Sequence, residues 1–228
     1  MPEMLNEQVF FVLIQFFVLL FSLSVHESAH AWSADMLGDS TARYLGRVSL
    51  NPIVHADLFG TIIFPLIGML SGVMFGWAKP VPVNVGRLRN PVRDHMLVAA
   101  AGPASNLALA AGFFLFMMAL KLSSPQGADL VREVTVGQAG PDAFWTPLAH
   151  VAYYGIVINL ILAVFNLIPV APLDGAAVLA GLLPRSAAVV LEQLQSYGLF
   201  ILVALLVAGV PSKLYNPVLE AVLSYLVF

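Results

Sequence analysis

The sequence predicts an all-α polytopic membrane protein, a bundle of about four to six transmembrane helices with a re-entrant segment and short membrane-associated β-strands. Of its 228 residues, 60% are hydrophobic and only 10% are charged, whereas soluble domains carry about 25% charged residues. The apolar residues are gathered into several long runs, which is the pattern of helices that cross a bilayer. We therefore expect one domain, residues 1–228, surrounded by lipid. The small net charge of −3 gives no indication of nucleic-acid binding.

The long apolar runs define the predicted spans. The first is Val9–Val25, which is expected to continue as helix through Trp32. No Lys or Arg precedes this run and no small-residue cleavage site follows it, so we predict a retained helix and not a signal peptide. Three further spans and a C-terminal half-span or interfacial helix are expected at Met96–Leu120, Leu148–Val170, Ala187–Val210 and Leu214–Phe228.

Two shorter segments do not fit the pattern of a spanning helix. Gly60–Phe75 is apolar but broken by Pro65, and it is shorter than the roughly 20 residues that a span needs. We predict a re-entrant segment there. Lys79–Val85 alternates apolar residues with prolines, which is typical of an edge strand, and Tyr44–Leu50 is a second candidate strand. An edge strand of this kind could bind an unwound substrate segment through main-chain hydrogen bonds.

The pattern H-E-x-x-H at residues 26–30 indicates metal chemistry. His26 and His30 are four residues apart, so on a helix they differ by about 40° in direction and lie about 6 Å apart along the axis. Both imidazoles can therefore bind one zinc ion, and we expect one Zn²⁺ per chain. Glu27 is placed to act as general base toward zinc-bound water. The absence of cysteine excludes thiolate ligands and a cysteine nucleophile.

An inert reading of the same motif is that the three side chains lie hydrogen-bonded at a helix end in the membrane interface. Each ionisable residue near the bilayer centre costs about 2.5–3.5 kcal/mol on insertion scales. Three such residues together therefore favour a functional site over the inert reading.

A catalytic zinc site of this type needs a third protein ligand. Asp174 is the best candidate, because its Pro-Leu-Asp-Gly stretch lies in an apolar part of the chain without an adjacent basic partner. An alternative role for Asp174 is to cap the helix that follows it. His55 and Asp57, in the loop after the zinc-binding helix, remain possible third ligands.

Three blocks of the sequence resemble the site-2 protease family of intramembrane zinc metalloproteases. They are His26-Glu-Ser-Ala-His30, Ala101-Gly-Pro-Ala-Ser-Asn106 and Asn166-Leu-Ile-Pro-Val-Ala-Pro-Leu-Asp174-Gly. The segments around residues 51–60 and 76–84 resemble a compact prokaryotic branch of that family without a PDZ or CBS domain. The resemblance implies regulated cleavage of the transmembrane segment of a membrane protein, with Glu27 catalytic and Asp174 the third ligand. It places Asn106 and Asn166 in family motifs, where substrate contact or hydrogen bonding to irregular backbone are the open alternatives.

The site also constrains the topology. If His26 and Asp174 meet, the spans before them must run in the same direction, so only one full crossing lies between the two spans and Gly60–Phe75 is re-entrant. Residues 33–95 then share one face and carry most of the basic residues, which the positive-inside rule places in the cytoplasm. We expect a multi-pass protein of the prokaryotic plasma membrane with its active site toward the cytoplasm.

Two other functions compete with proteolysis. A transporter or channel could use an intramembrane His/Glu/Asp cluster, but this does not account for the H-E-x-x-H spacing. An inactive relative that binds membrane helices would be expected to have lost the glutamate or a ligand, and both are present. The sequence leaves the substrate and the oligomeric state open.

Overall fold

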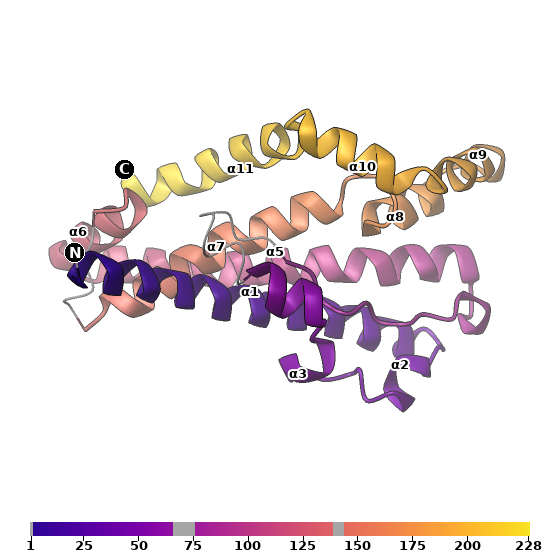
Figure 1. Cartoon of the computed structure of the whole chain (residues 1–228), viewed down its shortest axis with the longest axis horizontal. Coiled ribbons are helices and arrows are strands. Elements are labelled where there is room, and N and C mark those ends of the chain that lie inside the picture. Colours follow the sequence, from indigo (N-terminus) through magenta and orange to yellow (C-terminus); the bar gives the residue numbers. More distant parts are fainter. Residues whose placement is uncertain (1, 66–75, 139–143) are drawn as a thin grey trace.

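The computed structural model describes residues 2–65, 76–138 and 144–228, and the regular structure in these ranges is helical. Three helices form its centre: α1 (Pro2–Met36), α5 (Pro91–Ser123) and α7 (Thr146–Asn166). Each is long and apolar enough to cross a membrane. Figure 1 shows them side by side, with α1 and α7 running in one direction and α5 in the other.

The expected count of four to six spans is not supported in the described ranges. Among the described residues, only the pair α9 (Arg185–Gln195) and α10 (Gly198–Val207) could add a fourth span to the three central helices, and its two halves are bent by 75°. A Cβ on Gly198 would lie 2.4 Å from the carbonyl oxygen of Ala171. The chain therefore approaches another backbone closely at the point where a straight span was predicted, and it bends there.

The expected β-strands are wrong: no strand forms in the described part of the chain. Within the first candidate, Tyr44 ends the short helix α2 (Thr41–Tyr44), and a turn at Gly46 follows. In the second, Pro80 and Pro82 have no N–H with which to form a ladder. The alternation of apolar residues there reflects an irregular segment bounded by prolines and not a sheet edge.

The helices between α1 and α5 are short, and those after α2 begin at side-chain caps. Asn51 accepts a hydrogen bond from the N–H of Ile53 at the start of α3 (Pro52–His55), and Asp57 caps the π-helix η1 (Leu58–Ile63). The 3₁₀-helix η2 (Val85–Arg87) precedes α5. Residues 66–75 lie outside the described ranges, so the re-entrant path of Gly60–Phe75 remains a prediction.

The remaining helices pack around the central three. At one end of the bundle, α6 (Pro125–Thr135) and α11 (Val210–Val227) cover α5 and α7, with Met117, Ile156 and Leu226 fully buried between them. The helix α8 (Asp174–Leu182) lies against α5 near the other end (Figure 1). This arrangement brings the start of α8 to the face of α1 that carries His26 and His30.

Candidate metal centre and active site

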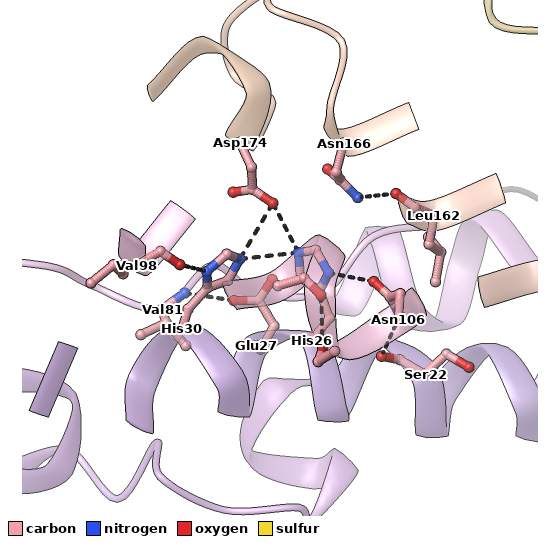
Figure 2. A network of polar contacts seen from close by, with 12 residues as sticks. Ser22, His26, Glu27, His30, Val81, Val98, Asn106, Leu162, Asn166 and Asp174 are labelled. Atoms are coloured by element: carbon pink, nitrogen blue, oxygen red, sulfur yellow. Dashed lines mark hydrogen bonds and ion pairs between the residues drawn. The ribbon is translucent and has the colours of Figure 1, made fainter. Parts of the chain in front are cut away.

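Three side chains from two distant segments converge on one point. His26 and His30 lie on α1, and Asp174 is the first residue of α8 (Figure 2). The Nε2 atoms of the two imidazoles are 3.0 Å apart, and Asp174 Oδ2 lies 3.1 Å from His26 Nε2 and 3.4 Å from His30 Nε2. These three are the His/Asp/Glu group in the described ranges that could hold a metal ion.

The hydrogen-bond partners of the imidazoles decide what these atoms can bind. His26 Nδ1 lies 2.6 Å from Asn106 Oδ1, and His30 Nδ1 lies 2.7 Å from the carbonyl oxygen of Val98. Both partners are acceptors, so each Nδ1 carries a proton. In the neutral ring, the form that binds a metal, this leaves the lone pair on Nε2, the atom that faces Asp174. The Asp174 Oδ2 atom is itself buried and accepts no hydrogen bond. Three buried lone-pair donors that face one another favour a bound cation.

The spacing of the three atoms fits zinc. Zinc binds imidazole nitrogen at about 2.0–2.1 Å and carboxylate oxygen at about 2.0–2.2 Å in a tetrahedral site, so its ligand atoms are roughly 3.3–3.5 Å apart. The observed separations of 3.0, 3.1 and 3.4 Å lie close to that range. Three ligands leave the fourth tetrahedral position for water or substrate.

Gly102 on α5 lets the central helix approach the two histidines. A Cβ at this position would lie 2.4 Å from His30 Nε2 and 2.6 Å from His26 Cε1. No side chain larger than hydrogen fits there without moving the imidazoles. The Gly-Pro-Ala-Ser-Asn block of the sequence thus supplies both the space for the rings and, at Asn106, a hydrogen-bond partner for one of them.

Glu27 faces a cavity that also contains the metal-binding atoms. The cavity has a volume of about 820 Å³, and Leu202 and Leu206 of α10 form part of its wall. Its ionisable and amide lining residues are His26, Glu27, His30, His95, Asn166 and Asp174. The Glu27 carboxylate accepts a hydrogen bond of 2.9 Å from the N–H of Val81, as Figure 2 shows.

Several main-chain and side-chain hydrogen bonds hold residues 77–84 along this cavity. The N–H of Trp77 donates to the Gly60 carbonyl, and the N–H of Lys79 donates to the His55 carbonyl. At the end of the segment, the N–H of Asn84 donates to Asp39 Oδ2 at 2.6 Å. The segment is therefore attached to η1, to α3 and to the turn after α1, and it presents the N–H of Val81 to Glu27 on α1.

The two predicted asparagines have different environments. Asn166, at the end of α7, is partly exposed and lines the cavity, and its Nδ2 donates to the Leu162 carbonyl. Asn106 is fully buried behind His26, and its amide binds His26 and Asn159. Substrate contact is therefore compatible with the position of Asn166, whereas Asn106 has protein partners at both ends of its amide.

The alternative third ligands have other partners. His55 Nε2 lies 2.7 Å from the Ser49 carbonyl, and Asp57 caps the N–H groups of Phe59 and Gly60. The capping role considered for Asp174 is not observed, because the cap of α8 is Leu173 and no side chain caps that helix.

The protein combines apolar helical spans with two histidines one turn apart, a converging carboxylate and a glutamate on the same cavity. These are the features of a membrane metallopeptidase. The model of Peptidase family M50 matches residues 14–209. The chain therefore belongs to peptidase family M50, which confirms the resemblance to the site-2 proteases. As a member of this family, it is a membrane zinc metalloprotease.

Two relatives, both with provisional zinc metalloprotease names, illustrate the extent of the similarity. YwhC of Bacillus subtilis is 38% identical over 204 residues, which cover 89% of this chain and 84% of that protein. Rip2 of Mycolicibacterium smegmatis is 28% identical over 193 residues, covering 82% of this chain and 64% of that protein. No solved structure matches the chain.

Sequence reasoning did not identify two contributors to the site. Asn159 belongs to no block of the resemblance, although an asparagine inside an apolar span is itself a signal, since polar groups there are costly. Val81 contributes only its backbone N–H, which no side-chain pattern indicates.

Proposed function

We propose that this chain cleaves peptide bonds in or near the transmembrane segments of membrane proteins, as the proteolytic step of regulated intramembrane proteolysis. In this proposal His26, His30 and Asp174 hold one zinc ion and Glu27 is the catalytic base. The observation that carries it is the convergence of three metal-binding atoms with Glu27 on one cavity of the helical bundle.

The roles of the residues follow from their positions. When bound, zinc supplies Lewis-acid polarisation of the scissile carbonyl and of the attacking water. Glu27, adjacent to His26 and facing the same cavity, accepts the proton of that water and transfers it to the leaving amine. The N–H of Val81 holds the carboxylate in place. In this proposal Asn166, which lines the cavity and donates one amide N–H to the Leu162 carbonyl, donates the other to the substrate backbone.

The substrate in this proposal is an unwound segment of a transmembrane protein. The cavity wall combines apolar side chains from α10 with the segment Trp77–Val83. In this proposal an extended peptide binds along this segment through main-chain hydrogen bonds, a mode of binding with little sequence demand. We further propose that the chain acts as one domain in the plasma membrane, with this cavity toward the cytoplasm.

The purified full-length protein tests this assignment. It should contain about one zinc per chain, and His26→Ala, His30→Ala or Asp174→Asn should weaken zinc binding and abolish cleavage of a model transmembrane substrate. Glu27→Gln should keep zinc and slow cleavage by about 10²–10⁴-fold, because the amide cannot accept the proton. The exposed Asp129→Asn on α6 is the matched control and should change neither.

Two outcomes contradict the proposal. Full zinc occupancy in the His26→Ala/His30→Ala double variant would show that these two residues are not zinc ligands. Cleavage at the wild-type rate by Glu27→Gln removes Glu27 from the mechanism. A transporter that uses the same cluster predicts ion flux that depends on these residues, without cleavage.

A further inference from the structure

A chain of buried hydrogen bonds connects His26 to α7. His26 Nδ1 lies 2.6 Å from Asn106 Oδ1, and Asn106 Nδ2 donates to Asn159 Oδ1 at 2.8 Å. Asn159 Nδ2 in turn donates to Ser22 Oγ and to the Gly155 carbonyl, both at 2.8 Å. Ser22, Asn106 and Asn159 are each 0% exposed. This series of hydrogen bonds thus joins α1, α5 and α7 in the interior of the bundle.

We propose that Asn159 is a positioning residue that acts through Asn106 to fix the tautomer and orientation of His26. The inference rests on the proposed function only in taking His26 as a metal ligand. It differs from a substrate-contact role, because neither asparagine is exposed and both amides are taken up by protein partners.

The Gly155 carbonyl, at the end of this series of hydrogen bonds, decides which group donates and which accepts in each of them. The Gly155 carbonyl can only accept, so the Asn159 amide must direct its NH₂ group toward it. The Asn159 oxygen then faces Asn106, which directs its own NH₂ group toward Asn159 and its oxygen toward His26. An acceptor at this place requires the proton of His26 on Nδ1 and leaves the Nε2 lone pair for the metal.

The two histidines differ in the partner that fixes the orientation of each ring. His30 Nδ1 donates directly to the backbone carbonyl of Val98 on α5, which no side-chain substitution removes. The orientation of His26 depends on two amides, of which Asn159 lies on a third helix. Substitution of Asn159 should therefore disturb one ligand and leave the other in place, so metal binding weakens without being abolished.

The test measures the zinc affinity of the full-length protein in detergent by competition with a chelator. Asn159→Leu, which has a similar volume and no amide, should weaken zinc binding about 10–100-fold, the usual effect of losing a partner of a metal-binding histidine. The Co²⁺-substituted variant should show altered d–d absorption bands. Leu160→Ala is the matched control, since Leu160 is the next residue on α7 and is buried in the apolar core. This control should lose thermal stability while keeping zinc affinity and the Co²⁺ spectrum.

A double-mutant cycle separates a shared path from two independent losses. If Asn159 acts through Asn106, Asn106→Ala should weaken zinc binding by a similar factor and adding Asn159→Leu to it should cause little further loss. The Asn106→Ala variant also tests the proposal if Asn159→Leu does not fold. In that case wild-type affinity and an unchanged Co²⁺ spectrum in Asn106→Ala overturn it.

The remaining outcomes are also decisive. Wild-type zinc affinity and an unchanged Co²⁺ spectrum in Asn159→Leu overturn the inference. An equal loss of affinity in Leu160→Ala also overturns it, because the effect is then a general response to a damaged core. If the wild-type protein binds no zinc, the proposed function itself fails, which the same measurements distinguish.

Discussion

At the scale of single residues, the candidate metal centre depends on a glycine that leaves room for the two imidazoles. The imidazoles of His26 and His30 occupy the space that a side chain at residue 102 of α5 would fill. Asp174 Oδ2 is buried, and its polar neighbours are the Nε2 atoms of the two imidazoles. A buried carboxylate oxygen beside two nitrogen lone pairs is costly unless a proton or a cation lies between them, and a bound cation removes that cost.

Gly102→Ala tests this packing. The new methyl group would lie 2.4 Å from His30 Nε2, so the imidazoles must move and zinc binding should fall below detection. Alanine is intrinsically better than glycine in a helix by about 1 kcal/mol, so the helix itself should not be weakened. The measurement is the zinc content of the purified variant together with its thermal unfolding.

Gly112→Ala is the matched control for this prediction. Gly112 lies on the same helix, and a Cβ there meets nothing within 4 Å. This variant should keep zinc and activity. A Gly102→Ala protein with wild-type zinc content would show that the rings do not need the space that we assign to them.

At the scale of elements, the segment at residues 77–84 connects Glu27, the proposed catalytic base, to the rest of the fold. Its N–H groups donate to carbonyls of Gly60 and His55 on one side, and to carboxylates of Glu27 and Asp39 on the other. Pro80 and Pro82 have no N–H and favour extended conformations before them. The segment can therefore be held in place by the protein without forming a strand.

Val81→Pro tests the contact with Glu27. It removes the N–H that donates to the Glu27 carboxylate at 2.9 Å, and proline suits a segment that already has prolines on both sides. The cleavage rate should fall about tenfold, the effect of losing one hydrogen bond worth ~1.4 kcal/mol, with unchanged zinc content. Val83→Pro removes an N–H without a bonding partner in the described ranges and should retain more activity. Equal rates in the two variants contradict a role for this hydrogen bond.

Asp39 links the end of the same segment to acid stability. Its carboxylate is 0% exposed. Burial raises its pKa, but hydrogen bonds from Thr41 and from the N–H of Asn84, together with the charge of Arg87, leave the pKa below its ordinary value of 3.8. A lowered pKa in the folded state stabilises the protein above pH 3.8, and this stabilisation is lost as the pH falls through the folded-state pKa.

Asp39→Asn should therefore reduce stability at neutral pH by about 1–3 kcal/mol, the range for a buried polar group that loses its partner. It should also show a smaller further loss on acidification below about pH 4 than the wild-type protein. Thermal unfolding in detergent across this range measures both effects. Parallel pH profiles of the wild type and the variant would contradict the assignment.

The sequence predicted the central elements well and the peripheral ones poorly, for identifiable reasons. The spacing of His26 and His30 indicates a shared ligand direction because helix geometry is local. The convergence of Asp174 with them is a tertiary contact, and the apolar surroundings of its Pro-Leu-Asp-Gly stretch and the family resemblance pointed to it. Alternating prolines and valines at residues 80–83 imitated a strand. The bend between α9 and α10 lies beside Gly198, whose backbone closely approaches that of Ala171, and no local pattern reveals this tertiary contact.

At the scale of the whole molecule, the site requires two parallel spans with one antiparallel span between them in sequence. α1 and α7 run in the same direction and α5 runs in the opposite one (Figure 1). The end of α7 and the start of α8 therefore lie at the same level of the bundle as His26 and His30. This arrangement also places the end of α1 and the start of α5 at the opposite end of the bundle from α6.

The orientation of this arrangement in the membrane can be tested with single cysteines, because the natural chain has none. Residues 33–95 carry Arg43, Arg47, Lys79, Arg87, Arg89 and Arg93, whereas residues 121–147 carry only Lys121 and Arg132. This bias favours a cytoplasmic location for the first group. Arg89, just before α5, and Glu133, on α6 beyond the other end of α5, are both exposed. Arg89→Cys should react with a membrane-impermeant maleimide only in inside-out vesicles, and Glu133→Cys only in intact spheroplasts.

Cleavage activity retained in both variants shows that each labelled protein is folded. The reverse labelling pattern would place the active site toward the outside, and labelling of both cysteines from one side would contradict a membrane-crossing α5.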